Sequence, residues 1–145
     1  MNKDPAAAES LSTRHLALGW RALLVFVCLG LLLESLLAFK VGSYVDVDHE
    51  ARRTMWRLAH AHGTGLALVN VAYGLTVRAF PATADALTSG CLITALLLVP
   101  GGFFGGGLDA HGGDPGILIL LVPPGAVALV VGIARVAHAV VSPRA

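Results

Sequence analysis

The chain has 145 residues, of which 56% are hydrophobic and only 13% are charged, whereas about 25% of the residues in an ordinary soluble domain are charged. Its formal net charge of +1 provides no basic surface for nucleic acid, so we expect no nucleic-acid partner. The composition therefore excludes a typical soluble domain and predicts a small, single-domain membrane protein.

The first long apolar segment covers residues 22–39. A tryptophan and an arginine precede it and a lysine follows it, as is typical of residues at the two membrane interfaces. No small-residue cleavage site follows, so we interpret the segment as a retained membrane helix and not as a signal peptide. The chain begins with small and polar residues, and we expect residues 1–19 to form a flexible cytoplasmic tail. His15 is expected to face water or lipid headgroups there.

Three further apolar segments are long enough to cross a bilayer, at residues 58–77, 86–106 and 116–134. Each of the four segments has about 18 to 22 residues, which at a rise of about 1.5 Å per residue matches a hydrocarbon core of about 30 Å. Short loops between them favour antiparallel neighbours. The sequence therefore predicts an all-α fold, an integral membrane antiparallel four-helix bundle, with a single four-span transmembrane domain at residues 20–141.

Glycines and prolines mark the last two segments. The third segment carries glycines four residues apart, a spacing that lets two helices approach closely, namely Gly101, Gly102, Gly105 and Gly106. Pro123 and Pro124 fall inside the fourth segment, where proline removes backbone hydrogen bonds. We expect a kink at these prolines that faces protein, because the freed carbonyl groups need partners.

The basic residues are distributed unevenly between the two sides of the predicted bundle. Six of the ten lie on the side of the termini: Lys3, Arg14, Arg21, Arg78, Arg135 and Arg144. The other four are Lys40, Arg52, Arg53 and Arg57. Because cytoplasmic loops carry an excess of Lys and Arg, we expect both termini in the cytoplasm. The expected location is the lipid bilayer of a bacterial inner (plasma) membrane.

Polar side chains inside these apolar segments are the strongest functional signal in the sequence. Glu34 lies in the first segment, and His60, His62 and Asn70 lie in the second. A carboxyl or imidazole group is costly at membrane depth and requires a partner or a role. At about 100° per residue, His60 and Asn70 share one helical face of small residues, while His62 points about 200° away from His60. We expect Glu34, His60 and Asn70 to form a buried polar core.

The same side chains are candidate metal ligands. Glu34, His60 and His62 lie toward the outer ends of their segments, and Asp109 and His111 follow the third segment, so all five are expected at similar depth. Carboxylate and imidazole groups bind divalent metals, and imidazole also ligates haem iron. The cofactor that this pattern suggests is a metal ion or a haem. The two histidines of the second segment cannot hold one ion together on an intact helix.

Three hypotheses about function are open at this point. The chain is a structural or accessory subunit or a homo-oligomer, whose partners are other membrane subunits or further copies of itself. Alternatively, it is a metal- or haem-binding membrane protein in electron transfer or metal handling. The third hypothesis is a proton-coupled small transporter that acts as an oligomer, with Glu34 titrating against His60. We find no nucleophile elbow, phosphate-binding loop or dinucleotide fingerprint, so no catalytic residue is predicted.

Overall fold

The computed structural model describes residues 5–111 and 113–142, and the regular structure in this part of the chain is helical, without strands. Its α-helices are α1 (Pro5–Ala38), α2 (Gly42–Val45), α3 (Glu50–Ala79), α4 (Ala86–Leu108) and α5 (Val122–Val141). Short 3-10 helices lie in the connections: η1 (Val47–His49), η2 (Pro81–Thr83) and η3 (Ile117–Leu121), the last of which runs directly into α5. The prediction of an all-α fold is confirmed.

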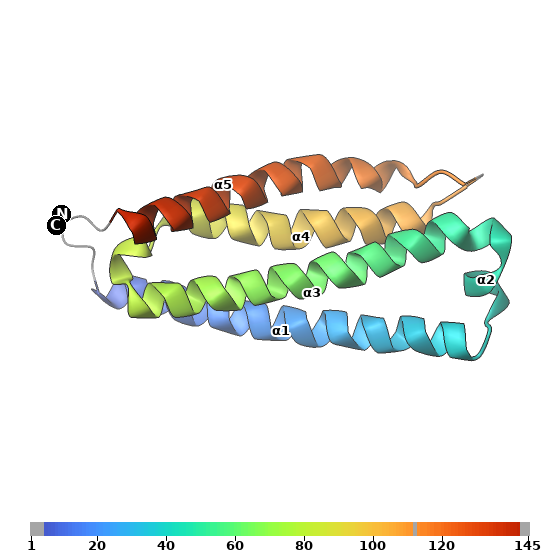
Figure 1. Cartoon of the computed structure of the whole chain (residues 1–145), viewed down its shortest axis with the longest axis horizontal. Helices are drawn as coiled ribbons and strands as arrows, with labels where there is room; N and C mark the ends of the chain where they lie inside the picture. Colours follow the sequence, from blue (N-terminus) through green and yellow to red (C-terminus); the bar gives the residue numbers. More distant parts are fainter. Residues whose placement is uncertain (1–4, 112, 143–145) are drawn as a thin grey trace.

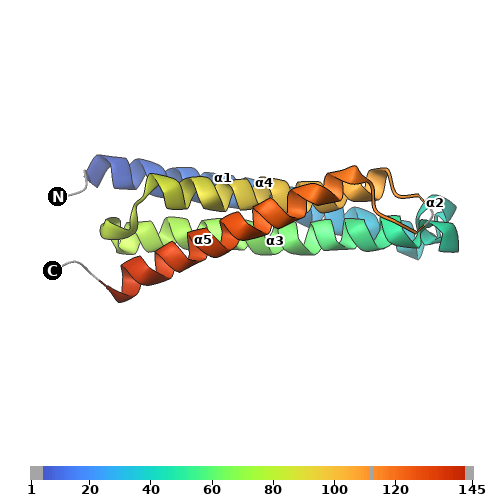
Figure 2. The same ribbon diagram turned by 90° about the horizontal axis from the view of Figure 1, so that it is seen from above.

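The four long helices run side by side and alternate in direction (Figure 1). Their spatial order follows the chain, because α1 packs on α3, α3 packs on α4, and α4 packs on α5. Within the described residues, α1 and α5 are not among the helix pairs with extensive contacts, so the row does not close into a ring. The view from above shows α5 inclined to the other long helices (Figure 2). The start of α1 and the end of α5 lie at one end of the molecule, and α2 lies at the other.

Helix α1 is much longer than the predicted first span. It has 34 residues, so it is about 51 Å long at the usual rise. Residues 5–19, which we expected to belong to a flexible tail, are helical, and this prediction is wrong for them. The physical reason is a stripe of residues spaced three or four apart, Ala8, Ser12, His15 and Gly19, that is buried against the neighbouring helices. The first four residues of the predicted tail lie outside the described residues.

Three helical segments are long and apolar enough to cross a membrane: α1, α4 and residues 117–141. Helix α3, which we predicted to be a further span, is not among them. Its polar side chains lower its hydropathy, yet His60 bonds to α1, and His62, although exposed, contacts Phe103 of α4. The structure thus supports three apolar candidate spans, and the four-span bundle stays a prediction.

The glycines of α4 allow η3 and α5 to approach closely. A Cβ atom on Gly102 would lie 2.9 Å from Val122 Cγ2 and 3.1 Å from the backbone oxygen of Leu118. A Cβ atom on Gly106 would lie 3.4 Å from Ile119 Cβ, and Gly105 is equally enclosed by Leu118. The close approach therefore occurs within the chain. Gly101 does not fit the expectation of close helix contact, because a Cβ atom added there would meet no neighbouring atom within 4 Å.

Pro123 and Pro124 lie in the first turn of α5 and not in the interior of a helix, where we expected them. The helix type changes at this point, from 3-10 in η3 to α from Val122 onward. Proline is tolerated in a first turn because the N–H groups there have no intrahelical partner. The structure therefore places a change of helix type where the sequence suggested a kink within one helix.

Candidate functional site

Buried polar side chains from three helices form a network near the end where α1 begins and α5 ends. His15 of α1 and Asn70 of α3 are both 0% exposed, and Ser89 of α4 is 4% exposed. His15 Nδ1 lies 2.8 Å from Asn70 Oδ1, and His15 Nε2 lies 2.7 Å from Ser89 Oγ. The Asn70 amide nitrogen donates to the Leu66 carbonyl, so Asn70 Oδ1 is the acceptor and His15 donates from Nδ1. The Ser89 hydroxyl then donates to Nε2 of the neutral ring.

The network continues to α5 through Tyr73 and Asp85. The Tyr73 ring packs edge-on against His15 with centroids 4.7 Å apart, and its hydroxyl lies 3.3 Å from the Thr83 backbone oxygen and 3.4 Å from that of Asp85. The Asp85 carboxylate accepts hydrogen bonds from the Thr88 N–H at 2.9 Å and from Arg135 Nη2 at 2.9 Å. Burial raises the pKa of Asp85, but the hydrogen bonds from Thr88 and Arg135 outweigh it and lower the pKa to about 2. The pair is therefore ionised at neutral pH.

Sequence reasoning missed His15, which was expected to face water. The contact between α1 and α3 explains the error, because a Cβ atom on Gly19 would lie 2.9 Å from the Val71 backbone nitrogen. This close approach sets the register of the two helices and brings His15 level with Asn70. The signal was present in the stripe of small and polar residues that runs along α1 before its apolar half.

A cavity of about 470 Å³ lies at the other end of the molecule, between α1, α2 and α3. This outer cavity is lined by five polar side chains, namely Glu34, Tyr44, Arg53, Arg57 and His60. Leu33, Leu37 and Ala61 are among its apolar residues. Its volume falls within the range of about 300 to 1,000 Å³ that is usual for small-molecule sites.

His60 is held in place by α1. Its Nδ1 donates to the Phe26 carbonyl at 2.7 Å. The ring lies against Gly30, since a Cβ atom there would be 2.7 Å from His60 Nδ1. Because Gly30 has no side chain, there is space for the His60 imidazole at the wall of the outer cavity.

Arg53 and Tyr44 join α2 to α3 on the same cavity. Arg53 Nη1 donates to the backbone oxygens of Tyr44 at 3.1 Å and Val45 at 2.9 Å, which are the carbonyl groups at the end of α2. Tyr44 is 2% exposed. Burial raises the pKa of its phenol, and this outweighs the opposite effect of Arg57 and Arg53, so the phenol is neutral at physiological pH.

Glu34 does not belong to a buried core. Its side chain is exposed, and among the described residues it makes no hydrogen bond or ion pair. Glu34 and His60 both line the outer cavity, but no hydrogen bond joins them, and Asn70 belongs to the network around His15. The predicted core of Glu34, His60 and Asn70 is therefore wrong as a single cluster. Burial follows the register of the helices and not the hydropathy of each segment.

The five candidate metal ligands do not come together. His62 lies on the opposite side of α3 from His60, with its ring 4.9 Å from that of Phe103, so the predicted helical phase is confirmed. Asp109 and His111 pair with each other at an exposed loop, 3.4 Å apart. Among the described residues, no three His, Cys, Asp or Glu side chains could hold a metal ion, so the predicted metal site has no support.

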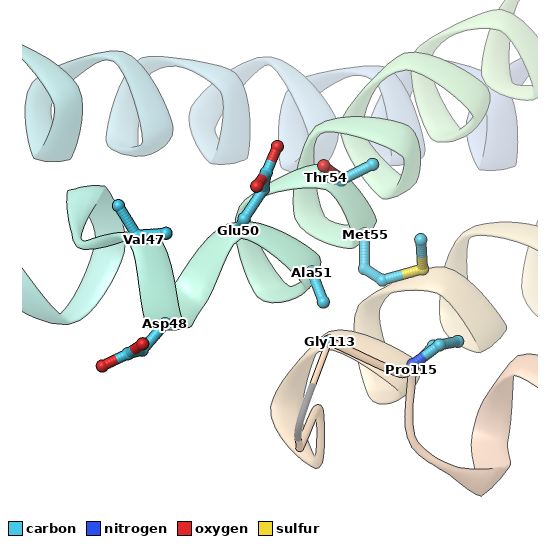
Figure 3. A pocket seen from close by; sticks show the side chains of 8 residues that line it. All are labelled: Val47, Asp48, Glu50, Ala51, Thr54, Met55, Gly113 and Pro115. Atoms are coloured by element: carbon cyan, nitrogen blue, oxygen red, sulfur yellow. The ribbon is translucent and has the colours of Figure 1, made fainter.

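A second hollow, of about 610 Å³, lies between the start of α3 and the loop after α4 (Figure 3). Met55 and Pro115 supply part of its apolar wall. Its two carboxylates, from Asp48 and Glu50, point in different directions (Figure 3). Because its charged groups do not converge, this hollow is a weaker candidate for a site than the outer cavity.

No family model, curated protein or solved structure matches the chain. What the chain can do chemically must therefore be inferred from its own side chains and their arrangement. The network around His15, near the start of α1 and the end of α5, joins four helices through partners that are already paired. The outer cavity is different, because it holds a carboxylate and a guanidinium group that do not pair with each other. The first arrangement links the helices to one another, and the second leaves Glu34 and Arg57 without a hydrogen-bond or ion-pair partner among the described residues.

Proposed function

We propose that this protein is an integral membrane protein with a structural role, either as an accessory subunit or as a homo-oligomer. The observation that carries the proposal is the exposed apolar surface at the two edges of the helix row. In the apolar windows of α1 and of residues 117–141, only 11% of the residues are buried. Contiguous apolar faces of this length are rare on soluble monomers and mark contacts with membranes or partners. Lipid and neighbouring subunits would cover them.

The buried network around His15 supports a structural role over a proton-transfer role. In a bilayer, helix association lacks a hydrophobic driving force and depends on close packing and interhelical hydrogen bonds. The His15 ring uses both of its nitrogen atoms on partners from α3 and α4. A proton relay needs groups that change partners, whereas these groups are enclosed and mutually satisfied.

Extraction and crosslinking test this proposal. We expect the full chain to stay in the membrane pellet at alkaline pH and to be released by detergent. A photo-reactive amino acid at Val130, which is 67% exposed on α5, should crosslink in native membranes to a second copy or to another membrane protein. The matched control carries the same group at Val77, which is 1% exposed. Release by alkaline buffer contradicts membrane insertion, and a crosslink to lipid alone contradicts the accessory or oligomeric role.

A further inference from the structure

The outer cavity contains opposite charges that do not meet. Glu34 of α1 and Arg57 of α3 both line it, and neither makes a hydrogen bond or an ion pair with another described residue. Both residues are exposed. A carboxylate and a guanidinium group on facing helices would gain energy by pairing directly. Their separation across a shared space leaves room for a molecule that contacts both.

Two arginines line one side of the cavity and have the charge and geometry that suit a phosphate group. Arg53 and Arg57 are four residues apart, so they project from the same face of α3. Arg53 is oriented by its bonds to the carbonyls at the end of α2, which occupy only its Nη1 atom. The remaining N–H groups of Arg53 and the whole guanidinium group of Arg57 are left for a ligand. The planar guanidinium group matches the spacing of phosphate oxygens.

Glu34 restricts which phosphate compound fits. A carboxylate repels a simple phosphate, so a ligand that satisfies the whole cavity must also carry a cation. A primary ammonium group has three N–H donors for the Glu34 carboxylate. Beside Glu34, Leu37 adds aliphatic surface to the lining and is 57% exposed on the apolar face of α1, whereas Leu33 is buried. The cavity is thus continuous with the surface that we assign to lipid.

We propose that the outer cavity binds the phosphoethanolamine headgroup of a membrane phospholipid. Arg53 and Arg57 hold the phosphate, Glu34 holds the ammonium group, and the acyl chains pass over the exposed Leu37 of α1. The proposal rests on the membrane insertion proposed above and adds a ligand class to it. A glycerol headgroup lacks the ammonium group, and a choline headgroup lacks N–H donors for the carboxylate.

The test uses the full chain reconstituted in vesicles of equal parts phosphatidylethanolamine, phosphatidylglycerol and phosphatidylcholine. After extraction in a mild detergent, native mass spectrometry counts the lipids that stay bound. We expect the wild type to retain phosphatidylethanolamine about tenfold over the other two lipids. Arg57→Gln should weaken its retention about tenfold or more, because charge-assisted hydrogen bonds to the phosphate are lost. Glu34→Gln should keep phospholipid bound but retain phosphatidylglycerol as well as phosphatidylethanolamine.

Arg52→Gln is the matched control. Arg52 is on the same helix, but its guanidinium donates to the Gly107 carbonyl and lies over the Trp56 ring, outside the outer cavity. This variant should retain lipid as the wild type does. Equal retention of the three lipids by the wild type overturns the proposal, as does an Arg57→Gln variant that binds normally or an Arg52→Gln variant that loses binding to the same extent.

The proposed function is checked separately on the same samples. Each variant is first tested for resistance to alkaline extraction and for its thermal unfolding temperature. A variant that is inserted and folded but shows no lipid preference contradicts the headgroup site and leaves the structural role intact. A wild-type chain that is extracted by alkaline buffer contradicts both proposals.

Discussion

His15 and Glu34 show how burial decides the role of an ionisable residue. Hydropathy places Glu34 inside an apolar segment and His15 before it, whereas in the folded chain His15 is 0% exposed and Glu34 is exposed. The difference arises because α1 and α3 are in contact along their length, with Gly19 against Val71. A single sequence reveals which residues share a helical face, but it does not reveal which residue of the next helix lies opposite.

The first prediction concerns Asn70, whose side-chain oxygen accepts from His15. Asn70→Ala should lower the free energy of unfolding by about 1 to 2 kcal/mol, because it leaves a buried N–H donor without a partner. Denaturation of the detergent-solubilised chain measures this change. Thr76→Ala is the control, since among the described residues the Thr76 hydroxyl bonds only to the Ala72 carbonyl of its own helix, and it should cost less than about 0.5 kcal/mol. An equal loss in both variants would show that the network adds nothing.

The second prediction concerns the ion pair of Asp85 and Arg135 and its dependence on pH. The Asp85 pKa is about 2 in the folded chain, against 3.8 for the free carboxyl group. Because the folded pKa is the lower one, the stabilisation is present at neutral pH and is lost as the pH falls from about 4 to about 2. Both side chains are partly exposed, 31% for Asp85 and 44% for Arg135, so solvent screening limits the effect to about 1 kcal/mol or less.

Comparison of the wild type with Asp85→Asn measures this effect. The difference in free energy of unfolding should be constant between about pH 5 and pH 8 and should shrink below about pH 4. The comparison is needed because other carboxyl groups also titrate at low pH. A difference that does not change between about pH 5 and pH 2 would contradict the assigned pKa.

At the scale of the helices, glycine decides how closely two elements approach. The repeated spacing in α4 predicted a close contact without identifying the partner, and the structure assigns that contact to η3 and α5 of the same chain. The sequence also predicted the start of α4 at residue 86 correctly. It could not predict η3, because a 3-10 helix and an α-helix of aliphatic residues have nearly the same pattern at this length.

The third prediction compares two neighbouring glycines of α4. Gly102→Ala should lower the free energy of unfolding by about 1 to 3 kcal/mol, because the new Cβ atom would meet the backbone of Leu118 at 3.1 Å. Gly101→Ala adds its methyl group to open space and should stabilise the helix by up to about 1 kcal/mol. Thermal unfolding of the two variants in the same detergent gives the comparison. A loss at Gly101 that matches the loss at Gly102 would mean that another chain or lipid packs on the open face of α4.

At the scale of the whole molecule, the position of α3 bears on how many times the chain would cross a bilayer under the membrane insertion that we propose. Hydropathy alone selects α1, α4 and residues 117–141, and three crossings would put the two ends of the chain on opposite sides. Yet α3 packs between α1 and α4, so it must share their surroundings. Its polar groups are compatible with this position, because Asn70 is fully buried and His60 bonds to α1. Mean hydropathy averages over all faces of a helix. It is therefore low for a helix with one polar face, even where that face packs against protein and not against lipid.

The last prediction follows from this argument. If α3 crosses with its neighbours, four crossings place the start of α1 and the end of α5 on one side of the membrane, as the shared end of the two helices in Figure 1 requires. The sequence assigns six of the ten Lys and Arg residues to the side of the termini, and this excess predicts a cytoplasmic position for that side. Fluorescent or enzymatic topology reporters fused to either terminus should both report a cytoplasmic position, and one placed after Gly113 should report the opposite side. Termini on opposite sides would show that α3 does not cross, and would require its His60 and Asn70 contacts to form outside the hydrocarbon core.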